Sequence, residues 1–272
     1  MLADAIAAER FRLLRDRSAL FWGFGFMPLV GFFLAIGGDL FVRNIVKRPM
    51  PGATIDLAAQ VIKALGNGAS TMAALFLMIG AASILAGDYR WETWRLRTPR
   101  NSRFNLLAAK LVVIGEAILW SLVLTVALTL AAAVIGAALN GKAIIPSPLG
   151  LSEIAGVFVV TWLEAMSLAA LAACVAVVAR SPMAAVVVCL VVRFVQSILA
   201  AALGAMAPEP TWKVLAIPAY DADLLRAFVT APSHSGLDGG PAGWALLALL
   251  GWIAALTAGA IVLFQRQDLT RE

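Results

Sequence analysis

Six long apolar stretches, separated by shorter polar segments, dominate the pattern of residues along the chain. A helix that crosses a bilayer needs about 20 consecutive, mostly apolar residues, and each stretch meets that length. The pattern therefore predicts an all-α integral membrane protein, with residues 1–272 forming a single transmembrane domain. The expected spans cover about residues 19–40, 69–87, 106–138, 152–179, 183–206 and 242–264.

An amphipathic segment at about residues 1–17 precedes the first span. Leu2, Ile6 and Leu13 share one side of the helix that this segment would form, while Asp4 and Arg12 lie opposite. We expect this helix to lie along the membrane interface before the chain turns into the first span.

Two of the connections are long enough to contain structure of their own. Within 41–68, residues 55–65 predict a short surface helix. Within 207–241, residues 215–229 are expected to dip into the interface. Pro208, Pro210 and Pro218 argue against a seventh span there.

The composition agrees with this class, because 62% of the residues are apolar and only 14% are charged. The net charge of +5 could indicate a nucleic-acid partner, but the basic residues lie between membrane-length apolar runs. Most of the 21 Lys and Arg fall on the side of the membrane that holds both termini. The positive-inside rule therefore places both termini in the cytoplasm, in a protein of the inner membrane with no nucleic-acid partner.

A nucleotide or metal site within the chain is not expected. Residues 136–142 match the phosphate-binding pattern G-x-x-x-x-G-K, but Ala143 replaces the hydroxyl residue that would bind Mg²⁺. His234 is the single histidine, and Cys174 and Cys189 both lie in apolar stretches. We therefore expect no cofactor to be bound by this chain itself.

We single out three ionisable residues inside the expected spans, Glu116, Glu164 and Arg193, together with Gln196, which lies one turn from Arg193. Ionisable groups at such depth are costly and are candidates for function. Glu164 and Arg193 lie about 24 and 20 Å from the turn at Arg180, by helical rise, so they reach similar depths on adjacent helices. We expect them to form an ion pair, which either orients the helices or contributes to a substrate path.

The densest charge in the chain lies between the second and third spans. From Asp88 to Arg103 there are five arginines against two carboxylates, interleaved with Trp91 and Trp94 and followed by a helix-stopping Pro99. A segment of this kind on the cytoplasmic side indicates a surface that a partner protein contacts.

These features together resemble the ABC-2 type permeases, the membrane subunits of ATP-binding-cassette transporters. The resemblance covers essentially the whole chain and rests on five short motifs in order. They are Glu9-Arg10-Phe11-Arg12, Asp88-Tyr-Arg-Trp-Glu-Thr-Trp-Arg95, Thr98-Pro-Arg-Asn-Ser-Arg103, Leu107-Ala-Ala-Lys-Leu111 and Phe264-Gln-Arg-Gln-Asp-Leu269. The chain departs from the family pattern in having Glu92, and no Gly, directly before Thr93.

The resemblance implies that this chain couples ATP hydrolysis to export of a hydrophobic or amphipathic substrate, such as a lipid, a drug-like molecule or a peptide. ATP and Mg would bind to a separate ATPase, present in two copies, and a second permease copy or related permease would complete the membrane part. The residues expected to contact the ATPase are Asp88, Tyr89, Arg90, Trp91, Glu92, Thr93, Trp94, Arg95, Arg97, Arg100, Arg103 and Arg180. A substrate cavity between spans two and five would be lined by Met72, Phe76, Val192, Gln196 and Leu199.

Three other functions stay open. An intramembrane enzyme, such as a protease or a lipid-modifying transferase, needs polar residues that converge at depth, and the sequence offers few of them. A channel needs polar rings along a span, and none stands out. A permease that serves the maturation of an extracytoplasmic metalloenzyme also fits the resemblance. We expect no catalytic residue in this chain.

Overall fold

The computed structural model describes residues 2–46, 53–90, 101–206, 216–230 and 239–267. Within them the fold is mainly α-helical, and six helical stretches are long and apolar enough to cross a membrane. This confirms the predicted all-α membrane fold. The six stretches are Arg17–Ile45, Thr71–Tyr89, Arg103–Asn140, Leu151–Ala179, Pro182–Leu203 and Gly240–Arg266.

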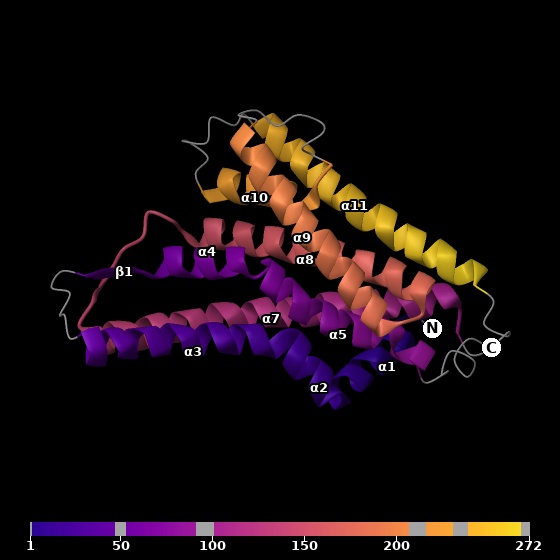
Figure 1. The fold of residues 1–272 in the computed structure, drawn as a ribbon, viewed down its shortest axis with the longest axis horizontal. Coiled ribbons are helices and arrows are strands. Elements are labelled where there is room, and N and C mark those ends of the chain that lie inside the picture. Colours follow the sequence, from indigo (N-terminus) through magenta and orange to yellow (C-terminus); the bar gives the residue numbers. More distant parts are fainter. Residues whose placement is uncertain (1, 47–52, 91–100, 207–215, 231–238, 268–272) are drawn as a thin grey trace.

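The first span is bent. After the N-terminal helix α1 (Leu2–Arg15), the chain continues through α2 (Arg17–Ala19), the π-helical η1 (Leu20–Gly25), α3 (Phe26–Phe41) and a second π-helical stretch, η2 (Val42–Val46). Asp16 caps α2 by accepting a hydrogen bond from the Ala19 backbone N–H at 2.9 Å. A π-helical turn interrupts the regular hydrogen-bond ladder, and Pro28 lacks an N–H, so both changes act near the bend seen in Figure 1.

The remaining helices form the rest of the bundle (Figure 1). They are α4 (Leu57–Asn67), α5 (Thr71–Arg90), α7 (Arg103–Asn140), α8 (Leu151–Ala179), α9 (Pro182–Met206), α10 (Pro218–Thr230) and α11 (Gly239–Arg266). We call the end of the bundle that holds α1, the last turn of α5, the first turns of α7 and the last turn of α11 the terminal end. The opposite end, with the start of α4 and of α8, is the distal end.

Two short helices lie between the spans. α4 was expected as a surface helix, but its Val61 and Leu65 are almost completely buried where it packs on α7 and α8. α10 falls within the segment expected to dip into the interface, and it packs against α8, α9 and α11 without being long enough to span.

A pair of three-residue strands joins two connections at the distal end. β1 (Thr54–Asp56) and β2 (Ala143–Ile145) pair in parallel, with Ile55 opposite Ile144. Just before β2, Gly141 ends α7 in the left-handed conformation, at φ 62°, which glycine adopts at little cost. The glycine of the rejected phosphate-loop pattern is therefore a helix cap.

The core lies where α5, α7 and α8 meet. Met78, Leu85, Ile114 and Ile118 are almost fully buried there, against alanine-rich turns of α8. Small residues let neighbouring helices approach closely where no water is available to drive packing. η1 and α5 approach each other closely, because a Cβ added to Gly23 would lie 2.5 Å from the Gly80 Cα.

Candidate functional site

A buried cluster of four charged side chains connects three helices at the terminal end. Lys110 of α7 lies 2.8 Å from Asp88 of α5 and 3.5 Å from Glu9 of α1. Arg12 of α1 completes the cluster, 2.9 Å from Asp88 and 3.1 Å from Glu9. We call Glu9, Arg12, Asp88 and Lys110 the terminal cluster.

Three members of this cluster are removed from solvent. Asp88 is 0% exposed, Lys110 1% and Glu9 4%. The Lys110 ammonium also donates to the Ile84 carbonyl at 2.5 Å, so both carboxylates and a backbone dipole surround it. Lys110 and Arg12 each face both carboxylates, so the loss of one carboxylate leaves the other to compensate in part.

The C-terminal end of the charged segment 88–103 is bound to the last turn of α11. Arg103, the first residue of α7, donates to the carbonyls of Phe264 and Gln265 at 3.1 and 3.0 Å. Tyr89 donates its hydroxyl hydrogen to Gln267 at 2.8 Å, and Gln267 donates in turn to the Val177 carbonyl of α8. The last carbonyls of a helix have no partner within the helix, so Arg103 acts as a cap for α11.

The residues expected to contact an ATPase divide between the described and undescribed parts of the chain. Asp88, Tyr89, Arg103 and Arg180 are described, and Arg90 is the last residue of α5. Trp91, Glu92, Thr93, Trp94, Arg95, Arg97 and Arg100 lie outside the described residues.

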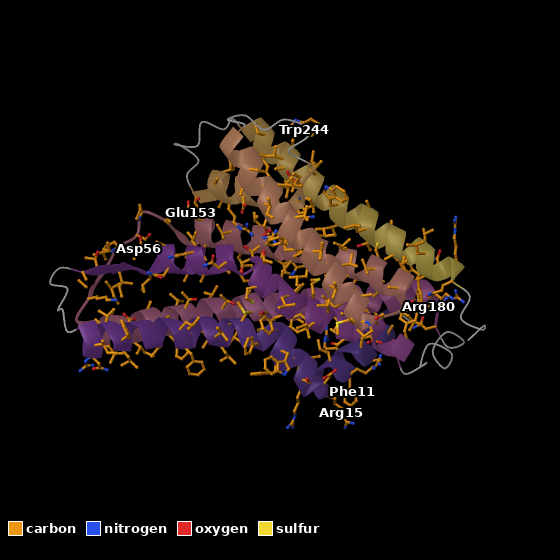
Figure 2. All side chains as sticks on the ribbon, in the orientation of Figure 1. Phe11, Arg15, Asp56, Glu153, Arg180 and Trp244 are labelled. Carbon is orange, nitrogen blue, oxygen red and sulfur yellow. The ribbon has the colours of Figure 1, made fainter. Side chains whose placement is uncertain are left out.

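Two of the described residues have surroundings that their place in the sequence does not specify. Asp88 was expected on the contact surface, but it is buried in the terminal cluster, where it fixes the base of the segment. Arg180 adopts a positive φ of 51° at the turn between α8 and α9, at the terminal end and far from Asp56 and Glu153 (Figure 2).

A more exposed ion pair also joins α1 to α7. Arg10 donates to both carboxylate oxygens of Glu116, at 2.9 and 2.6 Å. The side chains are 54% and 34% exposed, and exposed pairs contribute about 1 kcal/mol or less to stability. Glu116, expected as an intramembrane polar residue near the inner interface, is held by the N-terminal helix. Phe11 and Arg15 point away from the bundle (Figure 2).

A second buried cluster lies toward the distal end, between α8, α9 and α10. Arg193 is 2.7 Å from Glu164, so the ion pair expected from their depths forms. Arg226 of α10 pairs with the other oxygen of Glu164 and with Asp223, which is 68% exposed. We call Glu164, Arg193 and Arg226 the distal cluster.

Arg226 is the member that the sequence does not reveal. The sequence around Arg226 is a short helical segment next to two prolines. This context favours a re-entrant segment, but it does not identify the span that Arg226 contacts. Hydropathy places it in an outer connection, yet α10 carries its guanidinium to a carboxylate in the middle of α8.

Asp221, also on α10, is buried at 0% exposure. Neither of its carboxylate oxygens has a hydrogen-bond partner among the described residues. Burial disfavours the charged form and raises the pKa of Asp221 to about 8, in a helix that is not one of the six spans. The side chain therefore holds its proton at neutral pH.

The residues expected to line a substrate cavity lie on α5 and α9, two helices that pack against each other. Thr71 and Ser197 are 3.4 Å apart across this contact, and Phe76 packs on Phe26 with ring centroids 4.5 Å apart. Met72 and Leu199 are exposed, and Val192 and Gln196 are partly buried. A cleft of about 710 Å³ lies elsewhere, between α3, α4 and α7, and none of the five expected residues lines it. Their role at an axis between two permeases stays a prediction.

Both clusters are ion-paired groups that hold helices together, and neither places a nucleophile beside a base. In comparison with known proteins, no family model matches the chain, and a search of curated proteins finds no match.

Proposed function

We propose that this chain is the membrane-spanning permease subunit of an ATP-binding-cassette exporter. A separate ATPase, present in two copies, hydrolyses ATP, and a second permease copy or related permease completes the membrane part. The substrate is hydrophobic or amphipathic. The observation that carries the proposal is that both ends of the charged segment 88–103 are fixed to the bundle.

An ATPase can shift the conformational equilibrium of a membrane partner only through contacts that differ between states. A segment with loose ends would absorb a displacement. Here Asp88 is bound to α1 and α7, and Arg103 is bound to the end of α11. A displacement of the segment therefore reaches three helices directly.

The proposal includes an orientation. We place the terminal end in the cytoplasm of a cell whose inner membrane holds the spans, because Asp88 and Arg103, the two ends of the arginine-rich segment, lie there. The apolar outer face of α9, with Val191, Phe194 and Ile198 exposed, supports contact with lipid or with a second permease.

The test uses the full chain with the ATPase that co-purifies with it from native membranes. Glu92→Lys and Arg95→Glu reverse charge within the segment. Each is expected to reduce transport-linked ATP hydrolysis about tenfold, the effect of losing about 1.4 kcal/mol of coupling free energy. Arg43→Glu is the matched control, because Arg43 is exposed on η2 at the distal end.

Membrane insertion is measured in parallel, so that loss of coupling is separated from loss of protein. Unchanged ATP hydrolysis in both segment variants would contradict the proposed contact surface. If no ATPase co-purifies and the chain alone converts a lipid or cleaves a peptide, the intramembrane-enzyme alternative replaces the proposal.

A further inference from the structure

The cleft of about 710 Å³ has walls of opposite character. α7 forms its floor, and α3 and α4 pack on α7 at either side. The α3 wall is apolar and includes Met27, Val30 and Leu34, with Leu34 71% exposed. A volume of this size falls in the range of small-molecule sites.

The opposite wall is polar because α4 is amphipathic. Val61 and Leu65 are buried against the bundle, while Gln60, Lys63 and Asn67 line the cleft. These three positions are three and four residues apart, the spacing that places side chains on one face of a helix. The polar face of α4 is thus turned toward the apolar face of α3.

The floor adds a polar stripe. Ser121, Thr125 and Thr129 recur every four residues of α7 and all line the cleft. The outer face of the same stretch exposes Val123 and Leu130, as expected of a surface against lipid. Ser121 and Thr125 donate to the Phe24 and Ser121 carbonyls. Polar contacts to an occupant would therefore come chiefly from the α4 wall.

The charged residues that line the cleft indicate the charge of a molecule bound there. Lys142 is paired with Asp39 at 2.8 Å. Lys63 is exposed in the cleft, and no carboxylate pairs with it in the described part of the chain. The lining thus has one uncompensated positive charge.

The long dimension of the cleft suits a hydrocarbon chain. Its floor runs from Ile118 to Ala133, about 22 Å by helical rise. Nearer the terminal end the cleft is lined by Phe24, Leu77 and Ile118, all buried and apolar. An acyl chain fits this end, and an anionic group fits the rim at Lys63.

We propose that the cleft between α3, α4 and α7 binds a membrane amphiphile with an acyl chain and an anionic headgroup. The acyl chain lies along α3, and the headgroup contacts Lys63 and Gln60. The site lies within one chain and does not require an ATPase. This proposal can therefore be tested independently of the proposed transport function.

The experiment uses the full chain reconstituted in phosphatidylcholine vesicles that contain phosphatidylglycerol with a photoreactive acyl chain. Crosslinks are mapped by mass spectrometry. They are expected on the cleft-facing residues of α3 and α7, and unlabelled phosphatidylglycerol is expected to compete. Lys63→Gln should lower this labelling about fivefold, the effect of about 1 kcal/mol per basic residue, while a phosphatidylcholine probe is unaffected. Arg43→Gln removes an exposed cation outside the cleft and should change nothing.

A second pair of variants tests the acyl-chain half of the site. Gly31 of α3 lines the cleft, and a Cβ there meets no atom within 4 Å, so Gly31→Phe adds bulk to the cleft lining with no contact at its Cβ. Gly37, on the same helix, has equally open space but does not line the cleft, so Gly37→Phe is the matched control. Gly31→Phe should abolish labelling within the cleft and Gly37→Phe should not.

Three results would overturn the proposal. Labelling spread evenly over the exposed faces of α3, α9 and α11 would mean ordinary surrounding lipid. Cleft labelling that persists in Gly31→Phe would place the acyl chain elsewhere. Competition by glycerophosphoglycerol as strong as competition by the whole lipid would indicate a site for a soluble anion.

Discussion

In the terminal cluster two carboxylates, Glu9 and Asp88, face two cations, Arg12 and Lys110. In the distal cluster a single buried carboxylate, Glu164, faces the guanidiniums of Arg193 and Arg226. The first group is electrically balanced and its members share partners. The second has more buried positive than negative charge and depends on one residue. Similar ion pairs therefore respond differently to the loss of a single charge.

The largest effect is expected at Glu164. Glu164→Gln leaves the buried Arg193 without a carboxylate and leaves Arg226 with only the exposed Asp223, so it should lower stability by about 3–5 kcal/mol. Arg193→Gln should cost clearly less, because Arg226 still neutralises Glu164. The thermal unfolding midpoint of the detergent-purified chain measures both, and equal losses would show that Arg226 does not compensate.

A smaller loss is expected in the balanced cluster. Asp88→Asn leaves Lys110 near Glu9 and bonded to the Ile84 carbonyl, so we expect a loss of about 2 kcal/mol. The double variant Asp88→Asn, Lys110→Gln leaves Glu9 with Arg12 and should lose less than the two single changes combined. Additive losses in the same unfolding assay would contradict shared partners.

A third effect, small for each single pH unit, depends on pH and concerns Asp221, which lies on the same helix as Arg226. The pKa of Asp221 is raised from 3.8 to about 8 in the folded chain. Between these values the unfolded chain loses the proton and the folded chain keeps it. Stability should therefore fall as pH rises toward 8, by at most about 1.4 kcal/mol per pH unit, and level off above it.

Asp221→Asn removes this titrating group and should flatten that part of the pH dependence. Unfolding midpoints of both proteins at about pH 5 and about pH 8 give the comparison, at either side of the steepest change. A mutant with the same slope as the parent would show that other groups cause it.

The main elements were predictable because they depend on periodicity and length alone. The spans follow from apolar runs near bilayer length, and the Glu164–Arg193 pair follows from counting residues on both sides of the turn at Arg180. Both predictions use distances along regular helices, and these distances follow from residue numbers and the helical rise.

Other features depend on contacts between distant segments. Arg226 reaches Glu164 only because α10 packs between other helices, which its own residues do not specify. Asp88 and Lys110 look like ordinary charges at the ends of spans, yet they are buried because α1 folds over them. The three-residue strands β1 and β2 are too short to show alternation, and the cleft arises where three helices meet.

The contact between Gly23 and Gly80 has a mechanical consequence. With no side chain between them, η1 and α5 approach backbone to backbone at this point along the first span. On one side of that point lies α1, with the terminal cluster, and on the other lies α3, with the wall of the cleft. The crossing has the geometry of a fulcrum. If the first span tilts there as a unit, its two arms swing in opposite directions, and a push on α1 changes the width of the cleft.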